Sequence, residues 1–198
     1  HVKDHVQACR RAYYTLQGAG FNNTNTHANV ISYVWNSAIR PVLTYGVNCL
    51  PISKKSLNDM EKCQSMVLKS GLGLHKYCKS TPLLKAVNVH RIKTTLDITS
   101  LDLVKSIFNN VSRARTFYTH LLCRQERGEL KGHNNLLTRA RDICCTNNVS
   151  LFRFLFDKRY SSTVRNNFKN VYKVPDGLSD SVRQCLLSND PYNRNVLN

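Results

Sequence analysis

Acidic residues are scarce in this sequence, and no two of them are adjacent. Only 12 of the 198 residues are Asp or Glu. Polymerase, nuclease and many hydrolase sites hold Mg²⁺ between two or three converging carboxylates. The acids here are scattered: Asp97 and Asp102 are five positions apart, and Glu126 and Glu129 belong to a predicted loop. We therefore expect no catalytic residue and no bound cofactor in this chain.

Phosphate-binding and nucleophile motifs built on glycine are also missing. No G-x-x-x-x-G-K-[ST], G-x-G-x-x-G or G-x-S-x-G string occurs. The run Gly71-Leu72-Gly73 is too short to cradle phosphate and suits the end of a helix. Long apolar runs are missing too: none approaches the roughly 20 residues of a membrane span, and no signal-peptide pattern opens the chain. We expect no membrane partner and an intracellular location, in the nucleus, the cytoplasm or both.

Eight cysteines are present, and without an export signal we expect them to be reduced thiols. A group of zinc-type ligands lies within 26 residues: His120, Cys123, His133, Cys144 and Cys145. The gaps of 9 and 10 residues around His133 match no compact zinc knuckle or finger. Zinc stays the weaker alternative, and we assign no metal ligand. Several other cysteines occupy core-facing helical positions, where a thiol behaves as a small hydrophobe.

Positive charge is abundant where negative charge is scarce. The chain has 29 Lys and Arg, a net charge of +17 and a pI near 9.8. Residues 1–99 carry 13 basic and 4 acidic side chains, and residues 100–198 carry 16 and 8, so the excess is not confined to a tail. Such a surplus attracts polyanions, nucleic acid above all. The alternatives are a basic surface kept for solubility or for an acidic protein partner.

Apolar residues recur at helical spacing through most of the sequence, and no segment shows convincing strand alternation. We predict an all-α fold, a multi-helix bundle in which 1–90 forms one helical region and 91–198 a smaller C-terminal one. The predicted helices cover 2–17, the segment around 31–42, 53–70, 81–87, 91–124 with a break near Arg115, and shorter pieces at 135–146, 151–159, 161–172 and 179–188. Ser53, Ser150 and Ser179 are candidate N-caps.

Two of these helices carry specific expectations about which side faces the core. In the segment around 31–42 the inner face is predicted to hold Ile31, Val34, Trp35, Ala38 and Val42, with a kink at Pro41 because proline removes a backbone donor. In 151–159 the inner face is predicted to hold Leu151, Phe152, Leu155 and Phe156, whereas Phe154 and Tyr160 point outward.

Basic and aromatic residues interleave in two places. Residues 10–14 read Arg-Arg-Ala-Tyr-Tyr, with Arg10 one turn before Tyr14. Residues 151–173 hold six cations against one acid, Asp157, among several aromatic rings. Cations of this kind tether phosphates, and exposed rings can stack bases. The alternative for the rings is an ordinary apolar helix face.

The motif order over residues 1–95 resembles the region just downstream of the reverse transcriptase domain in non-LTR (LINE-type) retrotransposon polyproteins. The segments that carry the resemblance are RRAYYTLQGAG, IRPVLTYGVNCLPISKKSLNDMEKCQ and VLKSGLGL. They contain a Pro-x-x-x-Tyr-Gly pattern at 41–46, a Leu-x-x-x-Glu-x-x-Gln helix at 57–64, and a Leu-Gly turn before Thr81-Pro82. Each motif alone is common; their order and spacing together are more specific.

This resemblance implies a thumb and the helical region after it, which hold the template–primer beside the polymerase palm. The palm aspartates and their Mg²⁺ would lie upstream, so this chain would be a non-catalytic fragment of an RNA-directed DNA polymerase, with RNA, DNA and the palm as partners. The face around Trp35 is expected to be an exposed apolar surface for that palm. The alternative is a stand-alone helical module from a mobile element that binds nucleic acid or a protein.

We expect the phosphate contacts in two sets. The first set lies in the thumb-like part: Lys3, Arg10, Arg11, Tyr14, Lys54, Lys55 and Lys62. The second set lies in the C-terminal part: Arg153, Lys158, Arg159 and Arg165.

Overall fold

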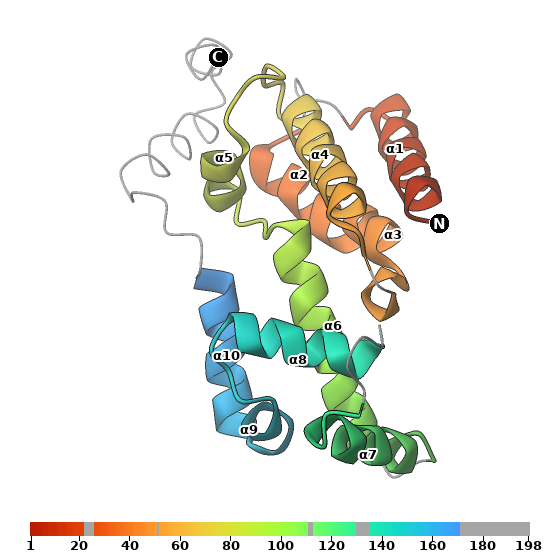
Figure 1. The fold of residues 1–198 in the computed structure, drawn as a ribbon. Helices are drawn as coiled ribbons and strands as arrows, with labels where there is room; N and C mark the ends of the chain where they lie inside the picture. Colours follow the sequence, from red (N-terminus) through yellow and green to blue (C-terminus); the bar gives the residue numbers. More distant parts are fainter. Residues whose placement is uncertain (22–25, 51, 111–112, 130–134, 171–198) are drawn as a thin grey trace. The chain divides into compact units, whose positions relative to one another are not determined.

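The computed structural model describes residues 1–21, 26–50, 52–110, 113–129 and 135–170. All regular secondary structure in these residues is helical, and none of them forms a strand. The predicted all-α class is therefore confirmed (Figure 1). The predicted helix at 179–188 with its cap Ser179 and the candidate ligand His133 lie outside the described residues.

The described chain divides into two compact units. The first contains His1–Tyr45 and Ser53–Lys93, and the second contains Gly46–Ile52 and 94–170. The first holds α1 (Val2–Gly18), α2 (Ala28–Val34), the π-helix η1 (Trp35–Ile39), α3 (Arg40–Thr44), α4 (Lys54–Gly71) and α5 (Ser80–Ala86). The second holds the 3-10 helix η2 (Val47–Cys49), most of α6 (Ile92–Asn109), α7 (Arg113–Glu126), α8 (Leu136–Thr146), α9 (Leu151–Phe156) and α10 (Lys158–Asn170). Because α6 begins in one unit and continues through the other, the division into domains at residue 90 stays a prediction.

In the first unit, α1 and α4 lie side by side, and α2 and α3 pack against this pair (Figure 1). The inner face of α1 is Val6, Cys9 and Tyr13, as the apolar spacing predicts. The Tyr13 hydroxyl donates to Ser70 Oγ at 2.9 Å, which satisfies a polar group at the edge of the core. A Cβ at Gly71 would lie 3.2 Å from the Ile31 side chain, so α4 approaches α2 closely only because this position lacks a side chain.

The predicted inner face of the segment around 31–42 is wrong in its second half. Ile31 and Trp35 are buried, but the core continues through Ile39 and Leu43, while Ala38 is exposed. A π-helix at Trp35–Ile39 precedes Pro41, which cannot donate a backbone hydrogen bond. Because a π turn inserts an extra residue, the inward positions after it move on by one. Trp35 is 0% exposed, so the expectation of an exposed face around it is also wrong.

Helix ends follow local chemistry that the sequence carries. Ser53 caps α4 and Ser150 caps α9, because each hydroxyl accepts from a backbone N–H three residues later, which confirms both predictions. At its other end α4 stops at Gly73, which has φ +68° and lets Leu74 N donate to Lys69 O at 2.8 Å. Asn88 and Asn148 end α5 and α8 in the same left-handed conformation.

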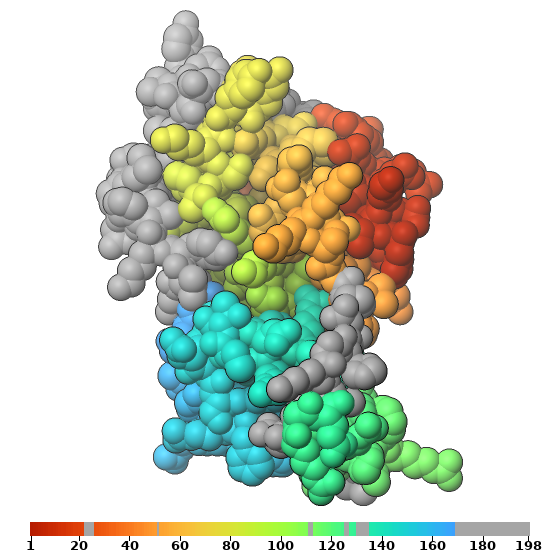
Figure 2. Space-filling model, in the orientation of Figure 1, coloured from red at the N-terminus to blue at the C-terminus, as the bar shows by residue number. Residues whose placement is uncertain are grey.

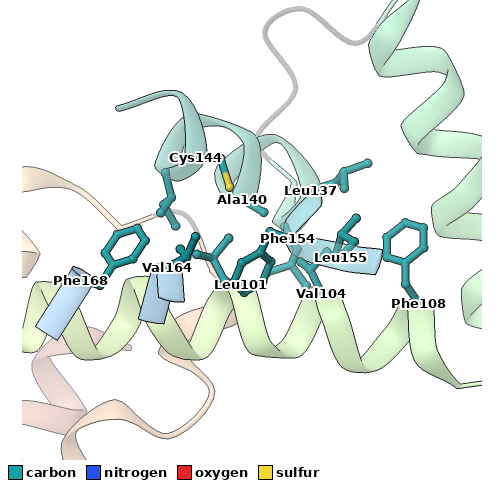
Figure 3. Close-up of a cluster of buried hydrophobic side chains, with 12 residues drawn as sticks. Leu101, Val104, Phe108, Leu137, Ala140, Cys144, Phe154, Leu155, Val164 and Phe168 are labelled. Atoms are coloured by element: carbon teal, nitrogen blue, oxygen red, sulfur yellow. The ribbon is translucent and has the colours of Figure 1, made fainter. Parts of the chain in front are cut away.

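The core of the second unit lies between α6, α8, α9 and α10. Leu101, Val104 and Phe108 project from α6 towards Leu137, Ala140 and Cys144 of α8, with Phe154, Leu155, Val164 and Phe168 from α9 and α10 between or beside them (Figure 3). The predicted break in the 91–124 pattern occurs between Asn109 and Arg113.

The predicted orientation of the 151–159 segment is wrong for its aromatic residues. Phe154 is 0% exposed, whereas Phe152 is 66% exposed and Phe156 also faces solvent. Leu151, Phe154 and Leu155 form an i, i+3, i+4 stripe, which is as regular a helical face as the one predicted. The six residues of α9 are too few for periodicity to decide between the two faces, and packing against the α6 and α8 core decides.

Candidate nucleic-acid interface

The predicted contacts on α1 all lie at the surface of the first unit. Lys3, Arg10, Arg11 and Tyr14 are exposed, because the opposite face of α1 is buried against its neighbours. Positions 3, 10 and 14 are spaced by seven and four residues and therefore share one face of the helix. This face carries cations beside an exposed tyrosine ring, an arrangement that can bind phosphate and stack a base.

The predicted contacts on α4 are also exposed. Lys54, Lys55 and Lys62 point away from the buried stripe that contains Met60, Gln64 and Val67. Lys55, Lys62 and Lys69 repeat every seven residues, about 10 Å apart along the helix axis. Figure 2 shows α4 and the segment that follows it, coloured orange to yellow, at the surface of the first unit. The row gives α4 a positively charged side.

A groove with a volume of about 620 Å³ lies along this side of α4 and α5. Four cations line it, namely Lys62, Lys69, Lys76 and Arg91, and among its lining residues Glu61 is the one acid. Serine hydroxyls contribute further donors from both walls. Apolar side chains, Met66, Leu74 and Leu84, complete the lining. The chemistry is that of a site for a phosphate-bearing ligand with an apolar or aromatic part.

Three hydrogen bonds hold the walls of the groove in place. Gln64, buried on α4, donates from Nε2 to His90 O at 2.8 Å. Arg91 donates from its guanidinium to Thr81 Oγ1 at the start of α5. The third bond joins α4 to the loop that follows it: Lys69 Nζ donates to Lys76 O at 3.0 Å. The cations are thus positioned by contacts within the first unit.

An exposed tyrosine lies next to a lining residue of the groove. Tyr77 is 77% exposed, and Lys76 Nζ lies 4.9 Å from the centre of its ring. The His75 ring is 5.0 Å from the Tyr77 ring, and Tyr77 N donates to His75 Nδ1 at 3.4 Å. These contacts orient an aromatic surface beside the cations.

Sequence reasoning found Lys62 but missed the other groove cations. Lys69, Lys76 and Arg91 are separated by up to 22 positions and stand in no aromatic-rich run. The seven-residue repeat of lysines on α4 was the available signal for Lys69. The other two reach the groove only because the segments before and after α5 fold back along α4, which no local pattern encodes.

The predicted second patch is organised differently. Arg153, Lys158 and Arg159 are exposed on α9 and α10, but the Arg153 guanidinium lies 4.9 Å from the Tyr160 ring centre, a cation–π contact. Arg165 is half-exposed and pairs with Asp102 of α6, its Nε donating to Oδ1 at 2.8 Å. Arg165 is therefore partly neutralised within its own unit.

Other cations of the second unit bind protein groups. Arg139 donates to the carbonyl oxygens of Asn48 and Leu50, at 3.3 and 2.8 Å, and so anchors the segment 46–52. Burial lowers the pKa of Arg139. Lys105 donates to Ser161 Oγ and lies 5.5 Å from the Phe154 ring, and desolvation lowers its pKa. Neither Arg139 nor Lys105 was among the predicted contacts.

No group of three or more His, Cys, Asp or Glu side chains comes together as a metal site in the described part of the chain. Of the zinc-type residues, His120 and Cys123 are exposed on α7, while Cys144 is buried on α8, where burial raises its pKa to about 11. Cys9 and Cys63 meet in the core of the first unit with their sulfurs 3.6 Å apart. The neighbouring Cys63 thiol and burial raise the pKa of Cys9, so it stays protonated.

No helix within the described ranges combines the length and the apolar character of a membrane span. Comparison with known proteins finds no family model, no curated protein and no solved structure that matches this chain.

Proposed function

We propose that this chain is the non-catalytic C-terminal part of a non-LTR retrotransposon reverse transcriptase and grips template–primer nucleic acid through its phosphates. The observation that carries the proposal is the groove of the first unit, in which Lys62, Lys69, Lys76 and Arg91 face one acid, Glu61. Cations gathered in a concave surface focus the field on a polyanion and raise its local concentration. Such contacts hold a nucleic acid in register without reading its sequence.

Two further observations support the proposal. The predicted cations of α1 and α4 are exposed, so phosphates can reach them without any rearrangement of the core. The motif order from RRAYYTLQGAG to VLKSGLGL is the support for a retrotransposon parent. In that arrangement the paired aspartates of the palm, which this chain lacks, perform the polymerisation.

A titration on a template–primer duplex at several salt concentrations tests the phosphate grip. Each phosphate neutralised on a duplex steepens the slope of log affinity against log salt by about 0.9. We expect a slope of about −4 or steeper, because several cations take part. A slope shallower than about −3 would be too weak for this mode of binding and would overturn the proposal.

Charge reversal on α1 separates local contacts from total charge. We expect Arg10→Glu/Arg11→Glu to lose retention on an immobilised polynucleotide. The matched control is Arg113→Glu/Arg115→Glu, which makes the same change in net charge at two exposed arginines of α7. Equal loss in both variants would mean that only net charge matters and would refute contacts on α1.

The reading frame upstream of His1 tests the parent protein. The proposal requires a polymerase palm there, with an aromatic residue and two adjacent aspartates in a turn. A frame without that turn would favour a stand-alone nucleic-acid-binding or protein-interaction module derived from a mobile element. Sequencing the transcript that encodes the chain provides this observation directly.

A further inference from the structure

The shape of the groove restricts what can enter it. Its volume of about 620 Å³ is that of a small-molecule site, on the order of 300–1,000 Å³. A duplex is stiff, with a persistence length of about 150 bp, and presents its phosphates on a convex surface. It can lie across the rim but cannot bend into a concavity of this size. An unpaired strand can, because its backbone turns at every nucleotide.

The lining also matches an unpaired nucleotide better than a paired one. Cations and hydroxyls line the same groove as Met66, Leu74 and Leu84. Leu74 and Leu84 are buried, but Met66 is half-exposed; it has no partner on a duplex backbone, whereas a splayed-out base or sugar would cover it. The exposed Asn58 amide adds a donor and an acceptor of the kind that base edges pair with.

Tyr77 supplies a stacking surface next to the phosphate-binding cations. Its ring is exposed and is oriented by Lys76, which itself lines the groove. Proteins that bind single strands combine a cationic groove with aromatic rings on which successive bases stack. Here the ring and one of the four groove cations, Lys76, are adjacent in the loop that follows α4.

From these observations we infer that the groove between α4 and α5 is a single-strand subsite, which takes an unpaired nucleotide or overhang of the bound nucleic acid. Lys62, Lys69 and Arg91 hold its phosphates, and Tyr77 stacks a base at the mouth. This inference rests on the proposed function and adds the strandedness of the ligand at this site. Glu61 opposes the phosphates and limits the affinity.

The experiment measures the affinity of the whole chain for a fluorescent twelve-nucleotide oligothymidylate and for a blunt duplex, by anisotropy at fixed ionic strength. Tyr77→Ala should weaken single-strand binding about 5- to 150-fold, since one stacked base contributes roughly 1–3 kcal/mol. The control Tyr33→Ala removes a comparably exposed ring on α2 that, unlike Tyr77, is not adjacent in sequence to a lining residue of the groove, and it should change nothing.

A second variant is designed to gain affinity, which loss of folding cannot imitate. Glu61→Gln should strengthen single-strand binding about threefold, because it removes the one acid of the groove lining. Its control Asp59→Asn makes the same charge change on the same helix, outside the groove lining, and should have a smaller effect. Neither glutamine nor asparagine introduces a new charge.

The two proposals fail in different ways. If the unaltered chain binds neither probe, the proposed function is wrong and the inference falls with it. If it binds the duplex with a steep salt dependence, but Tyr77→Ala and Glu61→Gln behave like their controls on the single strand, only the subsite is wrong. Weakening of duplex and single-strand binding by the same factor in Tyr77→Ala would also overturn it.

Discussion

The two halves of the chain have nearly the same charge excess, but the two units use their cations differently. In the second unit, Arg139 binds backbone carbonyls, Arg165 pairs with Asp102, and Arg153 lies on a tyrosine ring. In the first unit, Lys62 and Lys69 stand in a row on α4 beside an open groove. These cations of the second unit stabilise the protein itself, whereas Lys62 and the predicted cations of α1 are exposed in the first unit, although Lys69 and Arg91 also donate to protein oxygens.

This difference shows that net charge is a poor measure of a binding surface. A guanidinium that already donates to protein oxygens must give up those bonds before it can bind a phosphate. An exposed lysine exchanges only water and counterions, and release of the counterions favours binding. Lys158 and Arg159 remain exposed in the second unit, so its predicted phosphate-binding patch keeps two of its four cations fully available.

The largest expected effect is on the anchoring role of Arg139. Arg139→Ala should lower the free energy of unfolding by about 2 kcal/mol, because it removes the charged donor to the partly buried carbonyl of Asn48 and to the exposed carbonyl of Leu50. Urea denaturation followed by circular dichroism measures this. Arg139→Lys, which keeps one donor, should lose less. An unchanged midpoint for Arg139→Ala would contradict the structural role.

The corresponding prediction for the first unit concerns two lysines of α4. Lys62→Gln/Lys69→Gln should leave the urea midpoint nearly unchanged, since Lys62 is exposed and Lys69 contributes one peripheral hydrogen bond. For this double variant, the slope of log single-strand affinity against log salt should be shallower by about 1.4, because each lost phosphate contact removes about 0.7. The control Arg113→Gln/Arg115→Gln should retain the slope. A loss of stability without a change in slope would mean that these lysines are structural.

Much of the helical architecture could be predicted because the determining signals are local. The inner faces of α1 and α4 follow the apolar spacing, and Ser53 and Ser150 cap their helices through hydroxyls three residues from the bonded N–H. Both signals act within one or two helical turns. A single sequence contains all the information they need.

The errors occurred where the outcome depends on distant packing. The π-helix before Pro41 shifts the buried positions to Ile39 and Leu43. This shift is stabilised only by contacts with the rest of the first unit. Phe154 is buried and Phe152 exposed because the second core selects one of two equivalent faces. The groove was not predicted for the same reason, since its cations meet only when the segment 74–91 folds back along α4.

A smaller effect is expected when an internal cation of the second unit is released. Asp102→Asn removes the partner of Arg165 on a half-exposed surface, so the loss of stability should be at most about 1 kcal/mol. The freed guanidinium should raise duplex affinity about twofold, beyond the change seen in the control Asp142→Asn on the exposed side of α8. Equal gains in the two variants would show that Arg165 stays unavailable to phosphate.

The smallest expected effect concerns the left-handed residue at a helix end, which occurs in both units. Asn88 ends α5 and Asn148 ends α8 at φ +53° and +54°, a conformation that costs asparagine more than glycine. Asn88→Gly and Asn148→Gly should each raise the free energy of unfolding by about 0.5 kcal/mol. Gly73→Ala, at φ +68°, should lower it by about 1 kcal/mol for the same reason. The melting temperatures of the three variants test whether a left-handed residue at a helix end costs the same free energy in the two units. A higher melting temperature in only one of the two asparagine variants would show that the cost differs.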